Sequence, residues 1–201
     1  MVLLEGNSIW NNLKTAFINL DELLLFLKKQ EFNGYFHFEF SDCECALFLH
    51  EGDVVNGVEE RQEERRCGQF AVKNILQRSQ QDKHGTIMVV QLPSPTVGLL
   101  ANVYVTSEKL LHADSRPESM QFVGYISQLK KEGFSGYLEL EFTDDNTQGI
   151  ISFKNGKVKA IVSEELLADL QEESEAELKF IQSFMERAQH KGVKFKAYAR
   201  E

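Results

Sequence analysis

The sequence predicts an α+β protein with two similar small domains, each an antiparallel meander sheet with helices on one face. Three features favour this fold class: a long internal repeat, strands with strict apolar–polar alternation, and helices with an apolar stripe. The length of 201 residues suits either one large domain or two small ones. The repeat therefore decides the number of domains.

The internal repeat is clearest where Leu27–Asp42 is placed over Leu129–Asp144, with nine of sixteen positions identical. A hairpin farther along aligns after a register shift of two residues, so that Gly52 falls on Gly156. Solenoid units are about 20–50 residues long, and this repeat is much longer, so it indicates a duplicated domain.

The repeat and its spacing divide the chain into copy one at residues 1–92, a connector at 93–117 and copy two at 118–201. The Pro-Ser-Pro string that begins at Pro93 marks a boundary. The apolar content of Val97–Leu111 nevertheless indicates an ordered connector, and we expect helix there rather than a flexible tether.

Each copy begins with an amphipathic helix. In copy one the helix is predicted over Asn19–Gln30, with Asn19 as N-cap and Glu22 at the capping-box position. Its apolar stripe consists of Leu20, Leu23, Leu24 and Leu27. The equivalent helix of copy two is predicted over Met120–Lys131.

A three-stranded meander follows each helix, and strict alternation predicts one buried and one wet face. Phe36, Phe38 and Phe40 are expected inside in copy one, and Leu138, Leu140 and Phe142 in copy two. The next hairpin strands are expected to point Val54, Asn56, Val58, Val158, Ala160 and Val162 inward. Asn155-Gly156 predicts a type I′ turn, with Glu51-Gly52 as its weaker counterpart. A helix and a final Gly-led strand complete each copy.

Charge and cysteine content exclude several function classes. A net charge of −9 and a pI near 5.2 argue against nucleic acid and against an anionic membrane surface as partners. The odd number of cysteines, Cys43, Cys45 and Cys67, fits reduced thiols in a cytoplasm. The start of the chain has no charged n-region and only a short apolar run, so we expect a bacterial-type cytoplasmic protein without a signal peptide.

Motifs for catalysis or for cofactors are weak throughout. The loop Asp144–Gly149 begins like a calcium loop, but Asn155 stands where a bidentate Glu is required. A soft-metal cluster could be drawn from His37, Cys43, Cys45 and His50, yet these side chains should point to opposite faces of a sheet. No phosphate-binding Gly-Lys-Ser/Thr string is present. The sequence predicts no catalytic residue, no metal ligand and no cofactor, and hence no enzyme.

The strand FSGYLEL after the helix, followed by the hairpin ISFKNGKVKAI, resembles the PATAN family of bacterial signalling-associated domains. The resemblance covers about residues 15–92 and 118–201, and copy two matches better, at Gly136, Phe153, Gly156, Lys157, Val158 and Ala160. Copy one departs where Asn56 replaces a small apolar residue. The resemblance implies a signalling accessory that works through protein–protein contacts and has no catalytic residues.

The function that these observations favour is a non-catalytic interaction module in bacterial signal transduction or motility regulation. Its partner would be another signalling or motility protein, and the chain itself a monomer or homodimer. The candidate partner-binding residues are Glu164, Glu165, Glu172 and Glu173 in an acidic run, and Tyr35 and Tyr137 on the outer sheet faces. The acidic run could instead be solvated charge, and each Tyr could cover the edge of its own domain. The alternative function is a small-molecule sensor that binds a ligand between the copies.

Overall fold

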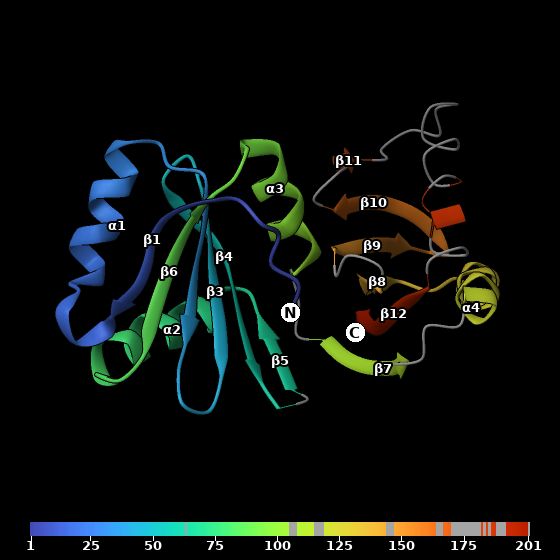
Figure 1. Cartoon of the computed structure of the whole chain (residues 1–201), viewed down its shortest axis with the longest axis horizontal. Coiled ribbons are helices and arrows are strands. Elements are labelled where there is room, and N and C mark those ends of the chain that lie inside the picture. Colours follow the sequence, from blue (N-terminus) through green and yellow to red (C-terminus); the bar gives the residue numbers. More distant parts are fainter. Residues whose placement is uncertain are drawn as a thin grey trace. The chain divides into compact units, whose positions relative to one another are not determined.

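The chain folds into two compact units with one antiparallel sheet each, shown in Figure 1. The computed structural model describes residues 1–62, 64–104, 108–114, 119–143, 147–163, 167–169, 182, 184, 186–187 and 192–200. The first unit is Glu5–Glu108, and the second unit combines Met1–Leu4 with Lys109–Arg200. Among the described residues, no helix has both the length and the apolar content needed to cross a membrane.

The first unit holds three α-helices around one sheet with the strand order β1-β6-β2-β3-β4-β5. Its elements are β1 (Asn7–Lys14), the 3-10 helix η1 (Thr15–Phe17), α1 (Leu20–Lys29), β2 (Gly34–Glu39), β3 (Glu44–His50), β4 (Asp53–Arg61), β5 (Glu64–Cys67), α2 (Gln69–Gln81), β6 (Thr86–Gln91) and α3 (Ser94–Val103). The meander β2-β3-β4 and the final strand β6 are confirmed. Strands β1 and β5 were not predicted.

The second unit has the strand order β7-β12-β8-β9-β10-β11. Its elements are β7 (Glu108–Asp114), α4 (Ser119–Lys131), β8 (Gly136–Phe142), β9 (Gln148–Lys154), β10 (Lys157–Ser163), β11 (Leu167–Asp169) and β12 (Val193–Arg200). The predicted first helix and meander of copy two are confirmed. Most of its predicted second helix lies outside the described residues.

Helix α1 begins and ends where its sequence dictates. The Asn19 side chain accepts a hydrogen bond from the Glu22 amide at 3.4 Å, which confirms the predicted N-cap. Acidic residues occupy the first turn and Lys28 and Lys29 the last, as the helix dipole favours. Leu20 and Leu27 are buried, so the predicted stripe faces the core.

The predicted apolar faces of the strands form the cores. In the first unit Phe36, Phe38 and Phe40 stack in a row, with ring centroids 6.0 and 5.9 Å apart, under α1 and α2. In the second unit the inward residues of β8 pack against α4, and this core contains Leu138, Leu140, Phe142, Phe122, Ile126 and Leu129. Alternation therefore identified the core side of both strands correctly.

The opposite sheet faces are not wet, which corrects the prediction of helices on one face only. In the first unit α3 packs on this second face, where the Phe48 ring stacks on Tyr104 with centroids 6.0 Å apart. In the second unit Val2 and Leu4 are buried, and the Val2 amide donates to a carboxylate oxygen of Glu139 at 3.1 Å. Glu139, predicted to face water, is only 6% exposed.

A bulge in each hairpin changes which residues face the core, and this is a second correction. The β3–β4 register shifts at Val55, and the β9–β10 register shifts at Lys159. One extra residue reverses the alternation beyond it. Val54 and Val158 do pack against the core clusters, as predicted. Asn56, Val58, Ala160 and Val162 are buried outside those clusters, on the opposite faces.

The two hairpin turns have the same geometry. Asn155 and Gly156 have φ of 52° and 74°, and Glu51 and Gly52 have φ of 51° and 80°, which confirms the predicted type I′ turns. The amide of each glycine donates at 2.8 Å to the carbonyl of a Phe that follows the helix, Phe32 or Phe134. The same local connection between helix end and hairpin thus recurs in both units.

The first part of the connector is helical, as predicted. Helix α3 covers Ser94–Val103, while Glu108–Asp114 forms a strand where helix was expected. Pro95 lies in the first turn of α3. Its fixed φ suits the helix, and a backbone amide at this position would have no acceptor within the helix. Residues 105–107 and 115–118 of the connector lie outside the described residues.

Asn56 joins α3 to the sheet. Its side-chain amide donates to the carbonyl oxygens of Ala101, at 2.7 Å, and Tyr104. Its side-chain oxygen accepts from the amides of Gly57, at 2.7 Å, and Gly68, at 3.0 Å. Because Gly68 is the N-cap of α2, one buried amide satisfies the end of α3 and the start of α2.

We expect Asn56→Ala to destabilise the first unit by about 2–4 kcal/mol, because it removes the four hydrogen bonds that this buried side chain makes to backbone groups. The measurement is urea unfolding followed by the fluorescence of Trp10, the only tryptophan, which packs on the first core. Asn74→Ala is the control, since its amide makes only a 3.3 Å bond to Glu59, and should change stability by less than about 0.5 kcal/mol. Equal effects of the two substitutions would contradict this role of Asn56.

Candidate functional site

The sequence-predicted partner residues are not gathered into one site. Glu164, Glu165, Glu172 and Glu173 lie outside the described residues. Tyr35 is 3% exposed and its ring tilts against Phe48, with centroids 6.2 Å apart. Tyr137 is fully buried and stacks on Tyr198 at 5.1 Å. Burial, together with the charge of Glu5, raises the pKa of Tyr35 to about 12. In this conformation neither tyrosine presents its side chain to a partner, and the geometry gives a binding role no support.

Of the four soft-metal candidates, Cys43 and Cys45 lie next to each other, with Sγ atoms 3.6 Å apart, while each histidine has a different neighbour. His50 Nε2 lies 2.8 Å from the Ser94 hydroxyl, and His37 Nε2 lies 3.8 Å from a carboxylate oxygen of Glu44. Burial lowers the pKa of His37 despite the neighbouring carboxylates. Within the described part of the chain, no three His, Cys, Asp or Glu side chains are grouped so as to hold a metal ion.

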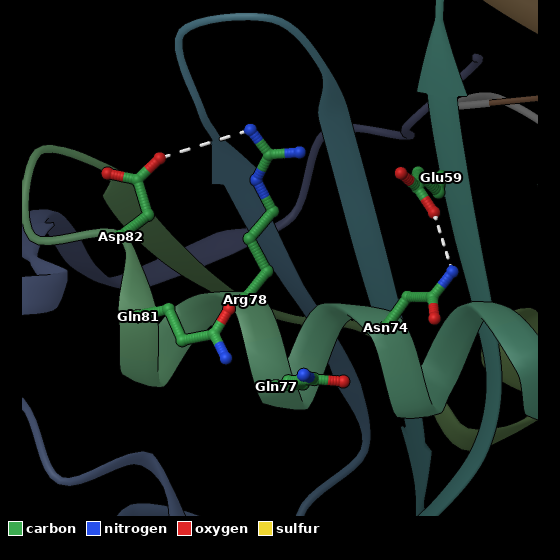
Figure 2. A pocket seen from close by; sticks show the side chains of 6 residues that line it. All are labelled: Glu59, Asn74, Gln77, Arg78, Gln81 and Asp82. Atoms are coloured by element: carbon green, nitrogen blue, oxygen red, sulfur yellow. Dashed lines mark hydrogen bonds and ion pairs between the residues drawn. The ribbon is translucent and has the colours of Figure 1, made fainter.

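A polar pocket lies on the first unit, against α2 and β4. Its volume is about 460 Å³, and Figure 2 shows the six residues that line it: Glu59, Asn74, Gln77, Arg78, Gln81 and Asp82. Arg78 reaches toward Asp82 at 4.0 Å, and the Asn74 amide donates to Glu59 at 3.3 Å. Amides and opposite charges in this arrangement can bind a polar group by hydrogen bonds.

Asp42 in the β2–β3 turn holds the neighbouring arginines. Its two carboxylate oxygens accept from Arg61 and from Arg78, one each. Desolvation alone would raise the pKa of Asp42, but the hydrogen bond and charge of Arg78, with those of Arg61, lower it. The guanidinium of Arg78 also lies over the Phe40 ring, 4.7 Å from its centroid. Arg78 thus links the turn, the core and the pocket.

A buried ion pair lies close by. The side chain of Arg65 is 1% exposed, and its guanidinium donates to Glu60 at 2.6 Å and lies 5.4 Å from the Tyr104 ring centroid. Burial opposes ionisation of Glu60, yet the charge of Arg65 contributes to lowering its pKa to about 2. A buried pair of this kind depends on both partners being charged.

Two smaller pockets continue this surface of the first unit. One, of about 320 Å³, is lined by Phe40, Asp42, Cys43, Glu44, Glu60 and Gln62. The other, of about 50 Å³, is lined by Glu59, Arg61, Glu64 and Arg66. Carboxylates outnumber guanidinium groups among the lining residues of the three pockets. The surface is therefore better suited to a cationic or neutral polar group than to an anion.

Sequence reasoning missed this surface. Asp42 entered only as a matching position of the repeat, and Arg61 and Arg78 were not singled out. The available signal was the position of Arg78, three residues after the buried Ile75, because helical neighbours at that spacing share a side of the helix.

We expect the free energy of unfolding of the first unit to fall less steeply with decreasing pH in Glu60→Gln than in the wild type. The pKa of Glu60 is lower in the folded than in the unfolded chain. Ionised Glu60 therefore stabilises the folded state fully above about pH 4.5, and this contribution is lost as the pH falls toward about 2. In Trp10-detected urea unfolding, the wild type should therefore lose about 2–3 kcal/mol more than the variant over this interval.

The variant should also be less stable than the wild type at neutral pH, because the buried guanidinium of Arg65 then loses the charge of Glu60. Glu64→Gln is the control, since the Glu64 side chain is 76% exposed and its ion pair with Arg66, at 3.5 Å, lies at the surface. An acid dependence as steep in Glu60→Gln as in the wild type would show that Glu60 does not carry it.

Comparison of the chain with models of known protein families gave no match. Comparison with curated proteins and with solved structures gave no match either. The resemblance to the PATAN family therefore rests on the quoted motifs alone.

Proposed function

We propose that the chain is a non-catalytic protein–protein interaction module, built from two PATAN-like domains that arose by duplication, and that it serves bacterial signal transduction or motility regulation. The recurring helix-to-hairpin connection supports the duplication. The observation that carries the interaction role is a set of exposed large apolar side chains on the helices of the first unit. These are Phe17, Leu25, Phe26 and Phe70, together with Val55 in the bulge of β4.

The exposure of these side chains is unusual for their type. Phe17 is 86% exposed, Phe70 59% and Leu25 57%. Burying a Phe or Leu side chain gains about 1.5–3 kcal/mol, and this gain is unused on the isolated chain. Exposed aromatic and apolar side chains surrounded by charged residues are typical of docking surfaces.

Three of these residues belong to neighbouring elements. Leu25 lies one helical turn from Asp21, which binds Gln80 of α2, and from Lys28, which binds Asp53 of β4 at 2.5 Å. Leu25 is therefore on the side of α1 that faces α2 and β4. Val55 belongs to β4 and Phe70 to the first turn of α2, the two elements to which these contacts join α1.

The proposed partner is another signalling or motility protein that presents apolar side chains to this region. Lys28, Lys29, Asp21 and Glu22 on α1 provide charged surroundings of both signs. Such a rim excludes water and selects the partner, while the buried apolar side chains supply most of the affinity.

We expect Leu25→Ser with Phe70→Ser to weaken partner binding at least tenfold while leaving the unfolding transition unchanged. The partner is first captured from the native cell with the wild-type chain and identified by mass spectrometry. Its affinity for the wild type and for the variant is then measured by titration calorimetry with both proteins purified. A loss of about 1.4 kcal/mol or more in binding free energy corresponds to tenfold.

Gln69→Ser with Lys73→Ser is the matched control, because it alters two exposed polar residues of α2 that belong neither to the apolar set nor to its charged rim. Reversal of Glu164, Glu165, Glu172 and Glu173 to Lys tests the acidic run separately, and predicts a weaker, salt-sensitive association if that run contributes. Unchanged affinity in the serine variant would overturn the helical docking surface. Unchanged affinity in both variants would contradict both the helical docking surface and the acidic run as binding sites.

A further inference from the structure

Two thiols of the first unit lie next to each other. Cys43 ends the β2–β3 turn and Cys45 is the second residue of β3, with Sγ atoms 3.6 Å apart. Residues i and i+2 of an extended chain point to the same side, so this proximity follows from the backbone. Both side chains belong to the first core cluster.

The two thiols differ in access. Cys43 is among the residues that line the pocket of about 320 Å³, and it keeps 6% of its surface exposed. Cys45 has no exposed surface and lies deeper in the core. A small reagent that enters the pocket therefore meets Cys43 first and Cys45 only through it.

The third cysteine is too far away to compete. Cys67 is opposite Val58 on β4, and Val58 is opposite Ala46 on β3. Two strand spacings place Cys67 about 10 Å from the row of Cys45, beyond the limit of about 7 Å between Cα atoms for a disulfide. Geometry alone thus selects the pair Cys43 and Cys45.

We propose that Cys43 and Cys45 are a reversible oxidation site, at which a peroxide converts the two thiols into an intrachain disulfide. The Cys43 sulfur attacks one peroxide oxygen and the O–O bond breaks. That oxygen stays on Cys43 as a sulfenic acid, and the other oxygen takes up the thiol proton and leaves as water. The Cys45 sulfur then attacks the sulfur of Cys43, the S–O bond breaks, and a second water leaves. The dithiol loses two electrons and two protons, and the peroxide accepts both.

Strain makes this disulfide easy to reduce. Two residues apart in a strand, Cα atoms are about 6.6–6.8 Å from each other, at the upper end of the range that a disulfide spans. A strained bridge has a more oxidising potential and is reduced readily by cellular thiols. Burial raises the pKa of Cys43 and of Cys45, so oxidation should be slow at neutral pH and accelerate as the pH rises.

The test treats the reduced full-length chain with hydrogen peroxide and maps its peptides without reduction. Trypsin releases Gln30–Arg61, which contains Cys43 and Cys45 but not Cys67. We expect this peptide to lose about 2 Da, and a thiol reductant to restore its mass. The Cys67→Ser variant should give the same result.

Two variants distinguish the order of the steps. In Cys45→Ala the sulfenic acid at Cys43 has no resolving thiol and should be trapped by dimedone, while in Cys43→Ala the oxidation of Cys45 should be slower than that of Cys43 in the wild type. A gain of about 32 Da on the wild-type peptide without any 2 Da loss would overturn the proposal, since it indicates sulfinic acid. A disulfide between Cys67 and either of the two cysteines would also overturn the proposal. The same holds if peroxide oxidises Cys43 and Cys45 in the urea-unfolded chain but leaves both unmodified in the folded chain.

Discussion

The first unit depends on one buried amide. Asn56 lies in β4 just beyond the bulge at Val55, and this bulge turns its side chain away from the core under α1 and α2. There it donates to two carbonyls at the end of α3 and accepts from the amide of Gly68, the N-cap of α2. Backbone groups at helix ends carry a high cost when they are buried without partners. Asn56 therefore allows a helix on each side of the sheet to end against the same strand.

Closure of the second sheet face has consequences for function. Once α3 covers Phe48 and Tyr35, the outer face of the meander is no longer available for docking. The exposed apolar side chains of the proposed docking surface lie instead on η1, α1, α2 and the bulge of β4. The polar surface formed by Asp42, Arg78 and their neighbours belongs to the same unit. A partner with apolar anchors and a polar or basic rim fits such a combination.

Much of the fold could be predicted because local rules decided it. The cap at Asn19, the Phe36–Phe40 alternation and the Asn155-Gly156 turn each depend on neighbouring residues only. The bulges could not be predicted, because the register of a hairpin depends on the partner strand. For the same reason the sequence showed Asn56 only as a departure from the family pattern and did not reveal its bonds to the helix ends. The polar strand β1 was missed because its pairing with β6 is irregular. Of the candidate site, sequence reasoning anticipated neither the Asp42 cluster nor the exposed side chains of α1 and α2, since both depend on packing between distant elements.

On this structure, α3 is an integral layer of the first unit rather than a linker between two domains. Hydrogen exchange of the whole chain, measured by mass spectrometry, tests this directly, because protection reports the free energy of local opening. We expect the amides of residues 98–103 to be protected to the same extent as those of β3 and to exchange only when the first unit unfolds. Exchange of these amides within seconds, while β3 stays protected, would contradict it.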